Sequence, residues 1–133
     1  MKFSEDISQE GFAIRGYAPG QVTVSGPFGE GAGGAELTLG ESFIIAPQQL
    51  IRGWPPVQVG DLLPEHFEAI VGMHPEVVII GVGATLRFPD PAVLSTLMGN
   101  GIGYEVMDTA AACRTYNILM GEGRQVAAAI LML

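Results

Sequence analysis

The sequence predicts an α/β fold: a three-layer single domain in which N-terminal β-hairpins accompany a central mixed sheet with helices packed on it. Residues 1–56 hold short β-type runs between turn residues, without a helical pattern. Residues 57–133 instead alternate helical and strand patterns. The length of 133 residues, with 48% apolar residues, suits one domain, 1–133, that has a substantial core.

Turn residues divide the β-rich half, residues 1–56. The run FAIRGYAPGQVTVSG, residues 12–26, predicts a hairpin whose turn contains Pro19 and Gly20. We expect EGAGGAEL to be a loop and SFIIAP to be a strand that ends at Pro47. The segment RGWPP closes this half, because consecutive prolines cannot continue a sheet. Its tryptophan, Trp54, either fills the core between the halves or anchors a partner, and we favour the core.

A helical pattern opens the second half of the chain. GDLLPEHFEAIVG, residues 60–72, places its apolar residues at helical spacing. Asp61 can cap this helix, Pro64 falls in its first turn and Gly72 can end it. PEVVIIGVG, residues 75–83, is apolar throughout, which is typical of a central strand covered on both faces.

Helices and strands continue to alternate to the C-terminus. A short helix begins at Pro91, YEVMD is a strand, TAAACRTYNILMGEG is a helix and RQVAAAILML is the last strand. Because helices connect these strands, we expect parallel pairing with right-handed crossovers. We also expect the helices against one face of the mixed sheet and the hairpins against its other side or edge.

Composition argues against several classes of function. The net charge of −8 repels phosphate backbones, so we expect no nucleic-acid partner. The single cysteine cannot form an internal disulfide, and Cys113 with His66 and His74 makes no metal-ligand pattern, so we expect no metal and no cofactor. The N-terminus lacks the apolar core of a signal peptide, and no apolar run approaches the roughly eighteen residues that span a bilayer. We therefore expect a cytoplasmic protein that does not span a membrane.

Two strand ends form the candidate site, because ligands of open α/β sheets bind at the carboxyl ends of parallel strands. Gly81 and Gly83 follow one strand, and Asp108 and Thr109 follow another, so we expect the two loops to share one rim if the strands are neighbours. A dinucleotide fingerprint needs a third glycine where Leu86 stands, so we do not favour a nucleotide. Asp108 and Thr109 are most simply helix-cap residues; alternatively, the N–H groups of the first turn bind a small anion.

The helix after Asp108 carries further candidates. We interpret Cys113 as a buried structural thiol, although a helix N-terminus and the neighbouring Arg114 are able to activate a thiol as a nucleophile. Arg87 is expected near the same rim, and two arginines there would favour a carboxylate, a phosphate or an acidic patch on a partner. The simpler alternative is a set of salt bridges to Glu105, Glu122 or Asp108. The polar residues that complete the candidates are Tyr116, Asn117 and Arg124.

Several of these segments also resemble a known family: PEVVIIGVG, GIGYEVMDTAAACRTYNILMGEGR, VAAAILML and a tryptophan before the first helix. The chain is similar over essentially its whole length to an uncharacterised domain family that includes the mitochondrial complex I assembly factor three and small archaeal and bacterial proteins. The resemblance implies a three-layer α/β fold with a central mixed sheet. It implies no established catalytic activity, since the mitochondrial member acts as an assembly factor and not as an enzyme. The positions that match the family's shared segments are Gly81, Gly83, Glu105, Met107, Asp108, Thr109, Cys113, Arg114, Thr115, Tyr116, Asn117, Glu122 and Arg124.

Two functions from different classes follow. The first, which we favour, is a non-enzymatic cytosolic protein of assembly-factor type that binds a protein partner, such as a subunit of a respiratory or other membrane complex. The alternative is a small-molecule or anion-binding protein, or an enzyme, with a cleft between Gly81–Phe88 and Asp108–Asn117. We assign no catalytic residue. The candidates for binding a ligand or a partner are Gly81, Gly83, Arg87, Asp108, Thr109, Cys113, Arg114, Tyr116, Asn117 and Arg124.

Overall fold

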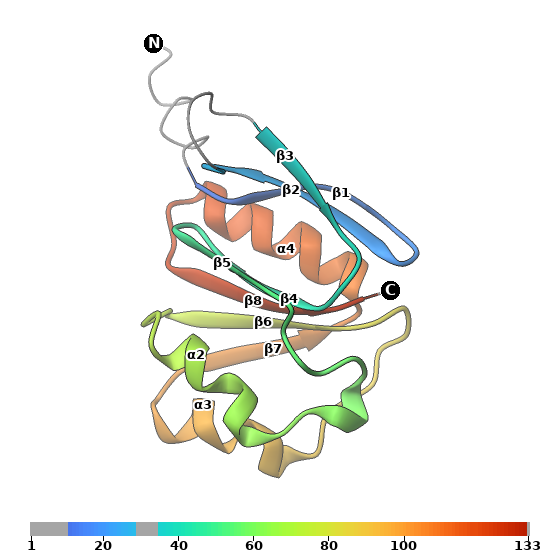
Figure 1. The fold of residues 1–133 in the computed structure, drawn as a ribbon. Helices are drawn as coiled ribbons and strands as arrows, with labels where there is room; N and C mark the ends of the chain where they lie inside the picture. The colour runs from blue at the N-terminus through green and yellow to red at the C-terminus, as the bar shows by residue number, and fades with distance from the viewer. Residues whose placement is uncertain (1–10, 29–34, 133) are drawn as a thin grey trace.

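Eight strands form two sheets in the computed structural model, which describes residues 11–28 and 35–132 (Figure 1). The smaller sheet is antiparallel, in the order β1-β2-β3, with bounds Ala13–Ala18, Gln21–Gly26 and Ala35–Leu39. β1 and β2 are the predicted hairpin, and Gly20 in its turn has a φ of 77°, which glycine adopts without strain. The loop predicted over residues 30–37 lies partly outside the described residues, and its last three residues belong to β3 instead.

The larger sheet is mixed and joins both halves of the sequence. Its order is β5-β4-β8-β6-β7, with β4 at Phe43–Ala46, β5 at Gln49–Arg52, β6 at Val77–Val82, β7 at Gly103–Met107 and β8 at Val126–Leu131. β6 is parallel to β7 and to β8, as predicted, whereas β4 runs antiparallel to β8. β4 ends before Pro47 as predicted, but the chain then turns within two residues and returns as β5, a strand that is not predicted from the sequence.

The helix predicted over residues 60–72 consists of three short pieces. They are η1 at Val59–Asp61, η2 at Pro64–Phe67 and α2 at Glu68–Val71. Leu63, between the first two pieces, is extended, because the residue before a proline avoids the α region. Pro64 therefore starts a new turn instead of lying within the first turn of one long helix.

The other predicted helix signals hold, apart from Asp61. Its carboxylate accepts backbone hydrogen bonds from Val57 at 3.1 Å and Gln58 at 3.2 Å, so Asp61, the last residue of η1, caps the start of η1 instead of the helix after it. Gly72 ends α2 as predicted. The remaining helical segments are η3 at Pro91–Leu94, α3 at Ser95–Gly99 and α4 at Thr109–Gly121.

Helices cover both faces of the larger sheet (Figure 1). α4 packs on β6 and β8, and the smaller sheet lies on this same side, with β1 against α4. The segments η2, α2, η3 and α3 cover the opposite face. The predicted fold class is confirmed, but the expectation that helices take one face and hairpins the other is wrong. Both faces need helical cover because β6 and β8 are apolar on both sides.

Alternate residues of the central strands supply two separate cores. Ile79 of β6 and Ile130 of β8 face α4, whereas Val78 and Ile80 face the opposite layer. Trp54 belongs to that second core, as predicted, and its indole N–H donates to the carbonyl of His66 at 3.0 Å. A buried indole with a hydrogen-bond partner is a stable core element, so Trp54 is not available as a partner anchor.

Candidate functional site

The carboxyl ends of β6 and β8 meet the first residue of α4, where the sequence predicts a shared rim. The Thr109 backbone N–H donates to the carbonyl of Gly83 at 2.8 Å, and the Gly83 N–H donates to the Thr109 hydroxyl at 2.9 Å. The hydroxyl in turn donates to the carbonyl of Leu131 at 2.5 Å. Gly83 and Thr109 therefore lie together, and the Thr109 hydroxyl is fully used between two strand ends.

Asp108 and Gly81 also serve the packing of α4 at this rim. The Asp108 carboxylate accepts from the Ala111 backbone N–H at 2.9 Å and so caps the helix. A Cβ at Gly81 would come within 2.9 Å of the Ala112 Cβ, so only glycine lets the helix approach the sheet this closely. These contacts explain the residue types at Gly81, Gly83, Asp108 and Thr109 structurally, and their ligand-binding role stays a prediction.

Cys113 faces the core between α4 and the sheets. It is 1% exposed, and burial raises the pKa of its thiol from 9.0 to about 12, outweighing the opposing effect of Arg114. A thiol with so high a pKa is protonated at neutral pH and is a poor nucleophile. The environment of Cys113 therefore matches the structural interpretation.

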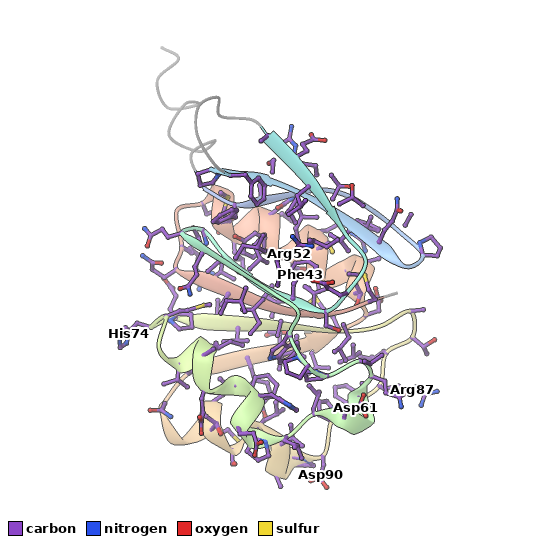
Figure 2. The ribbon with its side chains drawn as sticks, in the orientation of Figure 1. Phe43, Arg52, Asp61, His74, Arg87 and Asp90 are labelled. Carbon is purple, nitrogen blue, oxygen red and sulfur yellow. The ribbon has the colours of Figure 1, made fainter. Side chains whose placement is uncertain are left out.

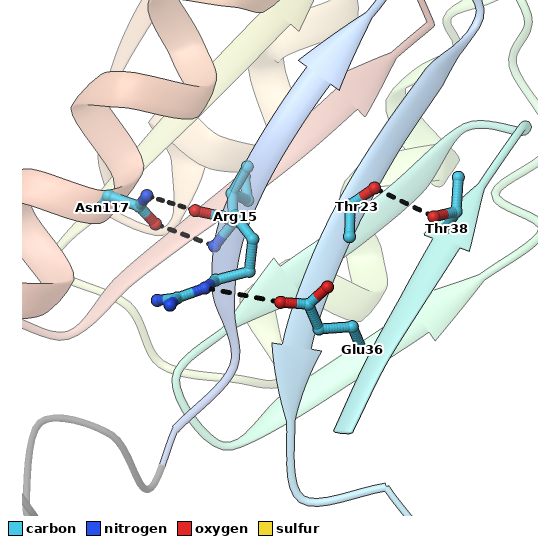
Figure 3. Close-up of polar contacts among 6 residues, drawn as sticks. Arg15, Thr23, Glu36, Thr38 and Asn117 are labelled. Carbon is cyan, nitrogen blue, oxygen red and sulfur yellow. Dashed lines mark hydrogen bonds and ion pairs between the residues drawn. The ribbon is translucent and has the colours of Figure 1, made fainter. Parts of the chain in front are cut away.

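Tyr116 and Asn117 hold α4 to β1 through polar contacts with backbone atoms. The buried Tyr116 hydroxyl donates to the carbonyl of Phe12 at 2.7 Å, and burial raises the pKa of this phenol. The Asn117 side chain accepts from the Ile14 N–H at 2.9 Å and donates to the Ile14 carbonyl at 2.5 Å (Figure 3). Asn117 thus occupies the outer edge of β1 as a neighbouring strand would.

Next to these buried contacts, α4 presents an exposed arginine. The Arg114 guanidinium donates to the hydroxyl of Tyr17 in β1 at 2.6 Å. Ile118 follows Arg114 by four residues, so it shares the same helix face, and it is 60% exposed. We call the surface formed by Tyr17, Arg114 and Ile118 the α4 surface. Tyr17 and Ile118 are not among the residues predicted from the sequence, although the spacing of Ile118 from Arg114 is a signal of a shared helix face.

The other two arginines among the candidates do not join this surface. Arg124 lies beyond the C-terminal end of α4 and pairs with Glu76 at 3.1 Å. The hydrogen bond from the backbone N–H of Gln125, and then the one from this arginine, lower the pKa of the Glu76 carboxyl. Arg87 lies exposed in the loop after β6, at one end of the molecule (Figure 2). The salt bridges predicted for Arg87 and Arg114 with Glu105, Glu122 or Asp108 are absent from the part of the chain that the structure describes.

The smaller sheet that supports Tyr17 is fastened by contacts across its strands. The Thr23 and Thr38 hydroxyls are 2.9 Å apart between β2 and β3, and Arg15 lies 3.9 Å from the Glu36 carboxylate (Figure 3). The Arg15–Glu36 pair is exposed, so its contribution to stability is small. Together with Asn117, these contacts hold β1 in a defined position against α4.

The chain belongs to the family described as a protein of unknown function, DUF498/DUF598, whose model matches residues 14–131. This match includes the whole rim and the α4 surface. None of the helices in the described residues has the length and the apolar character needed to cross a bilayer.

Two proteins that are similar to this chain have names that refer to different roles. The mouse protein named NADH dehydrogenase (ubiquinone) 1 alpha subcomplex assembly factor 3 is 33% identical over 90 residues, covering 66% of this chain and 48% of its own length. The chain thus spans about half the length of this curated relative. The 13 kDa major membrane protein of Francisella tularensis is 30% identical over 99 residues, covering 71% of this chain and 80% of its own.

The fold recurs in solved structures. A crystal structure of a protein from Bordetella parapertussis superposes with a TM-score of 0.80 at 30% identity, covering 93% of this chain and 98% of the other. The arrangement of two sheets around α4 is therefore shared with an experimentally determined relative.

Proposed function

We propose that the protein is a non-enzymatic factor of assembly type, which binds a protein partner through the α4 surface. The partner is a subunit of a respiratory or other membrane complex before that complex is complete. The kinship with a named assembly factor supports this role. The proposal places the protein in the cytoplasm, where a reducing environment keeps its buried Cys113 a free thiol.

The observation that carries the proposal is the Arg114–Tyr17 contact beside the exposed Ile118. Arginine and tyrosine are enriched at binding hot spots, and an apolar neighbour increases the area that a partner can bury. The hydrogen bond of 2.6 Å fixes the guanidinium before a partner arrives, which reduces the entropy lost on binding. Asn117 adds rigidity because it fastens β1 to the same helix.

Partner binding suits the described side chains better than anion binding or catalysis does. At the rim, the Thr109 hydroxyl and backbone N–H already have partners, and the Asp108 carboxylate adds negative charge where an anion would approach. The Cys113 thiol and the Tyr116 hydroxyl are buried and bonded or packed within the core. Arg114 is exposed, and its hydrogen bond to the Tyr17 hydroxyl gives the guanidinium a defined orientation on the face that also carries Ile118.

Site-specific photo-crosslinking in living cells tests the proposal. A photoreactive residue replaces Ile118 in one variant and Met98, which is equally exposed on α3, in a control variant. We expect the Ile118 position to crosslink subunits of a membrane complex and the Met98 position not to do so. Arg114→Glu, added to the Ile118 probe, should reduce these crosslinks at least about tenfold, as the loss of a hot-spot residue would.

Two outcomes would contradict this function. The first is a set of crosslinked proteins that does not differ between the Ile118 and Met98 positions. The second is a specific crosslinked protein that Arg114→Glu leaves unchanged, because the guanidinium would then play no part in binding. Arg114→Lys serves as the matched substitution, since it keeps the charge but cannot reproduce the planar geometry of the guanidinium.

A further inference from the structure

A second exposed surface is formed by two segments at one end of the molecule, the loop after β6 and the segment before η2. Its apolar members are large side chains from these two segments, and the most exposed are Val57 at 73% and Phe88 at 72%. We call it the apolar end surface and define it by Val57, Leu63, Leu86 and Phe88. The two segments run into η2 and η3, which pack against each other. Figure 2 places the charged residues Asp61, Arg87 and Asp90 of these segments at the same end of the molecule.

The loop that carries Leu86, Arg87 and Phe88 is held at both ends. Before it, two hydrogen bonds fix Gly83 to Thr109. After it, Pro89 is buried, and the Asp90 carboxylate accepts from the backbone of η3 at 2.9 Å. All five residues from 84 to 88 are nevertheless exposed. A loop that is anchored at each end and displays a leucine and a phenylalanine to solvent is prepared for a contact with another molecule.

The charges around this surface include both signs, which makes it complementary to itself. Arg87 forms no ion pair within residues 11–28 and 35–132. Asp61 and Asp90 are exposed nearby in the same two segments. In a dimer with two-fold symmetry, the apolar end surface of one chain lies against the same surface of the other chain. Arg87 of one chain can then face a carboxylate of the other. A membrane fits less well, because anionic lipid would pair with Arg87 but repel Asp61 and Asp90, whereas a second copy offers a partner to both signs.

We infer that the apolar end surface is a self-association site, through which two copies of the chain bind about a two-fold axis. Leu86 and Phe88 are buried at the centre of the contact, and Arg87 faces Asp61 or Asp90 of the other copy. This dimer uses residues outside the α4 surface, so it does not depend on the proposed function. The α4 surface of each copy stays available to a partner.

Analytical ultracentrifugation over a concentration series tests the inference. We expect the wild-type chain to approach twice its 14.0 kDa mass as the concentration rises. Phe88→Ser should raise the dissociation constant by about thirtyfold or more, because it removes a central aromatic side chain. Arg87→Glu should weaken the dimer because it sets like charges against each other, whereas Arg87→Lys should retain it. Met98→Ser, at an exposed apolar position on α3 outside this surface, should not change the dissociation constant.

The alternatives give distinct results. A single-chain mass up to near-millimolar concentration would overturn the inference. So would a dimer that persists unchanged in both Phe88→Ser and Arg87→Glu, since its interface would then lie elsewhere. Flotation with vesicles of phosphatidylglycerol and phosphatidylcholine tests whether the surface binds a membrane. A monomer that binds these vesicles only when Phe88 is present would assign the surface to a membrane instead. Circular dichroism establishes that each variant is folded.

Discussion

The Thr109 hydroxyl accepts the Gly83 N–H at 2.9 Å and thereby ties the first residue of α4 to the loop that leaves β6. The same hydroxyl donates to the end of β8, and the Thr109 N–H returns a bond to the Gly83 carbonyl. One threonine therefore joins three elements at the carboxyl edge of the sheet. The loop that presents Leu86 and Phe88 begins at this joint, so its position depends on Thr109.

Thr109→Val tests the strength of this joint. Valine keeps the shape of threonine but leaves the Gly83 N–H and the Leu131 carbonyl without their side-chain partner. We expect the free energy of unfolding to fall by about 2–3 kcal/mol, because buried polar groups lose hydrogen bonds. Thr109→Ser keeps the hydroxyl and should lose clearly less. Urea unfolding of the two variants measures the difference, and equal losses would mean that the hydroxyl contributes little.

Gly81→Ala tests how closely α4 approaches β6. The added methyl group would meet the Ala112 Cβ at 2.9 Å and the Thr109 Oγ1 at 3.1 Å, so the helix must shift. We expect a loss of about 1–3 kcal/mol, as for other overpacked cores. Gly60→Ala is the matched control, because a methyl group there meets nothing within 4 Å. The urea midpoints of the two variants give the comparison, and similar midpoints would contradict the close packing.

The sequence predicted the elements whose signals are local. β6 is recognisable because burial on both faces leaves an uninterrupted apolar run, and α4 because Asp108 begins it. β5 was missed because Gln49–Arg52 is short and follows a proline. The sequence predicts a single helix over residues 60–72, because the apolar spacing continues through Pro64, whereas the structure has three short pieces.

Some features of the candidate site can likewise be predicted from the sequence, and others cannot. The meeting of Gly83 and Thr109 follows from parallel neighbouring strands, so the topology alone predicted it. Sequence patterns do not show which hydrogen-bonding groups are already used, and the roles of Asn117 and Tyr116 depend on backbone atoms 103 and 104 residues away. The Arg114–Tyr17 contact likewise spans 97 residues. Such pairings require the relative positions of elements that the sequence alone leaves open.

Asn117→Asp tests the contact between α4 and β1. Aspartate can still accept the Ile14 N–H, but it cannot donate to the Ile14 carbonyl, which it would repel. We expect a loss of about 1–3 kcal/mol in the free energy of unfolding. Asn117→Ala removes both bonds, so the Ile14 amide should then exchange its hydrogen faster than in either Asn117→Asp or the wild type. Hydrogen exchange followed by nuclear magnetic resonance measures this order. An unchanged exchange rate at Ile14 would show that another group protects the edge of β1.

Cys113 should respond to thiol reagents only when the protein unfolds. Its burial and its pKa of about 12 keep it protonated and inaccessible at neutral pH. We expect iodoacetamide to label the native protein slowly and the urea-unfolded protein rapidly, with mass spectrometry as the readout. Rapid labelling under native conditions, at a rate independent of urea, would restore the nucleophilic interpretation.

The same raised pKa predicts how stability depends on alkaline pH. The pKa of the thiol is 9.0 in the unfolded chain and about 12 in the native state. The native state therefore favours the protonated form. Below pH 9 both states are protonated and the effect on stability is constant. Between pH 9 and 12 the unfolded chain loses the proton first, so the free energy of unfolding falls by about 1.4 kcal/mol per pH unit through this group. Cys113→Ala should reduce this slope in urea titrations between pH 9 and 10, and an unchanged slope would mean that the thiol is not the group responsible.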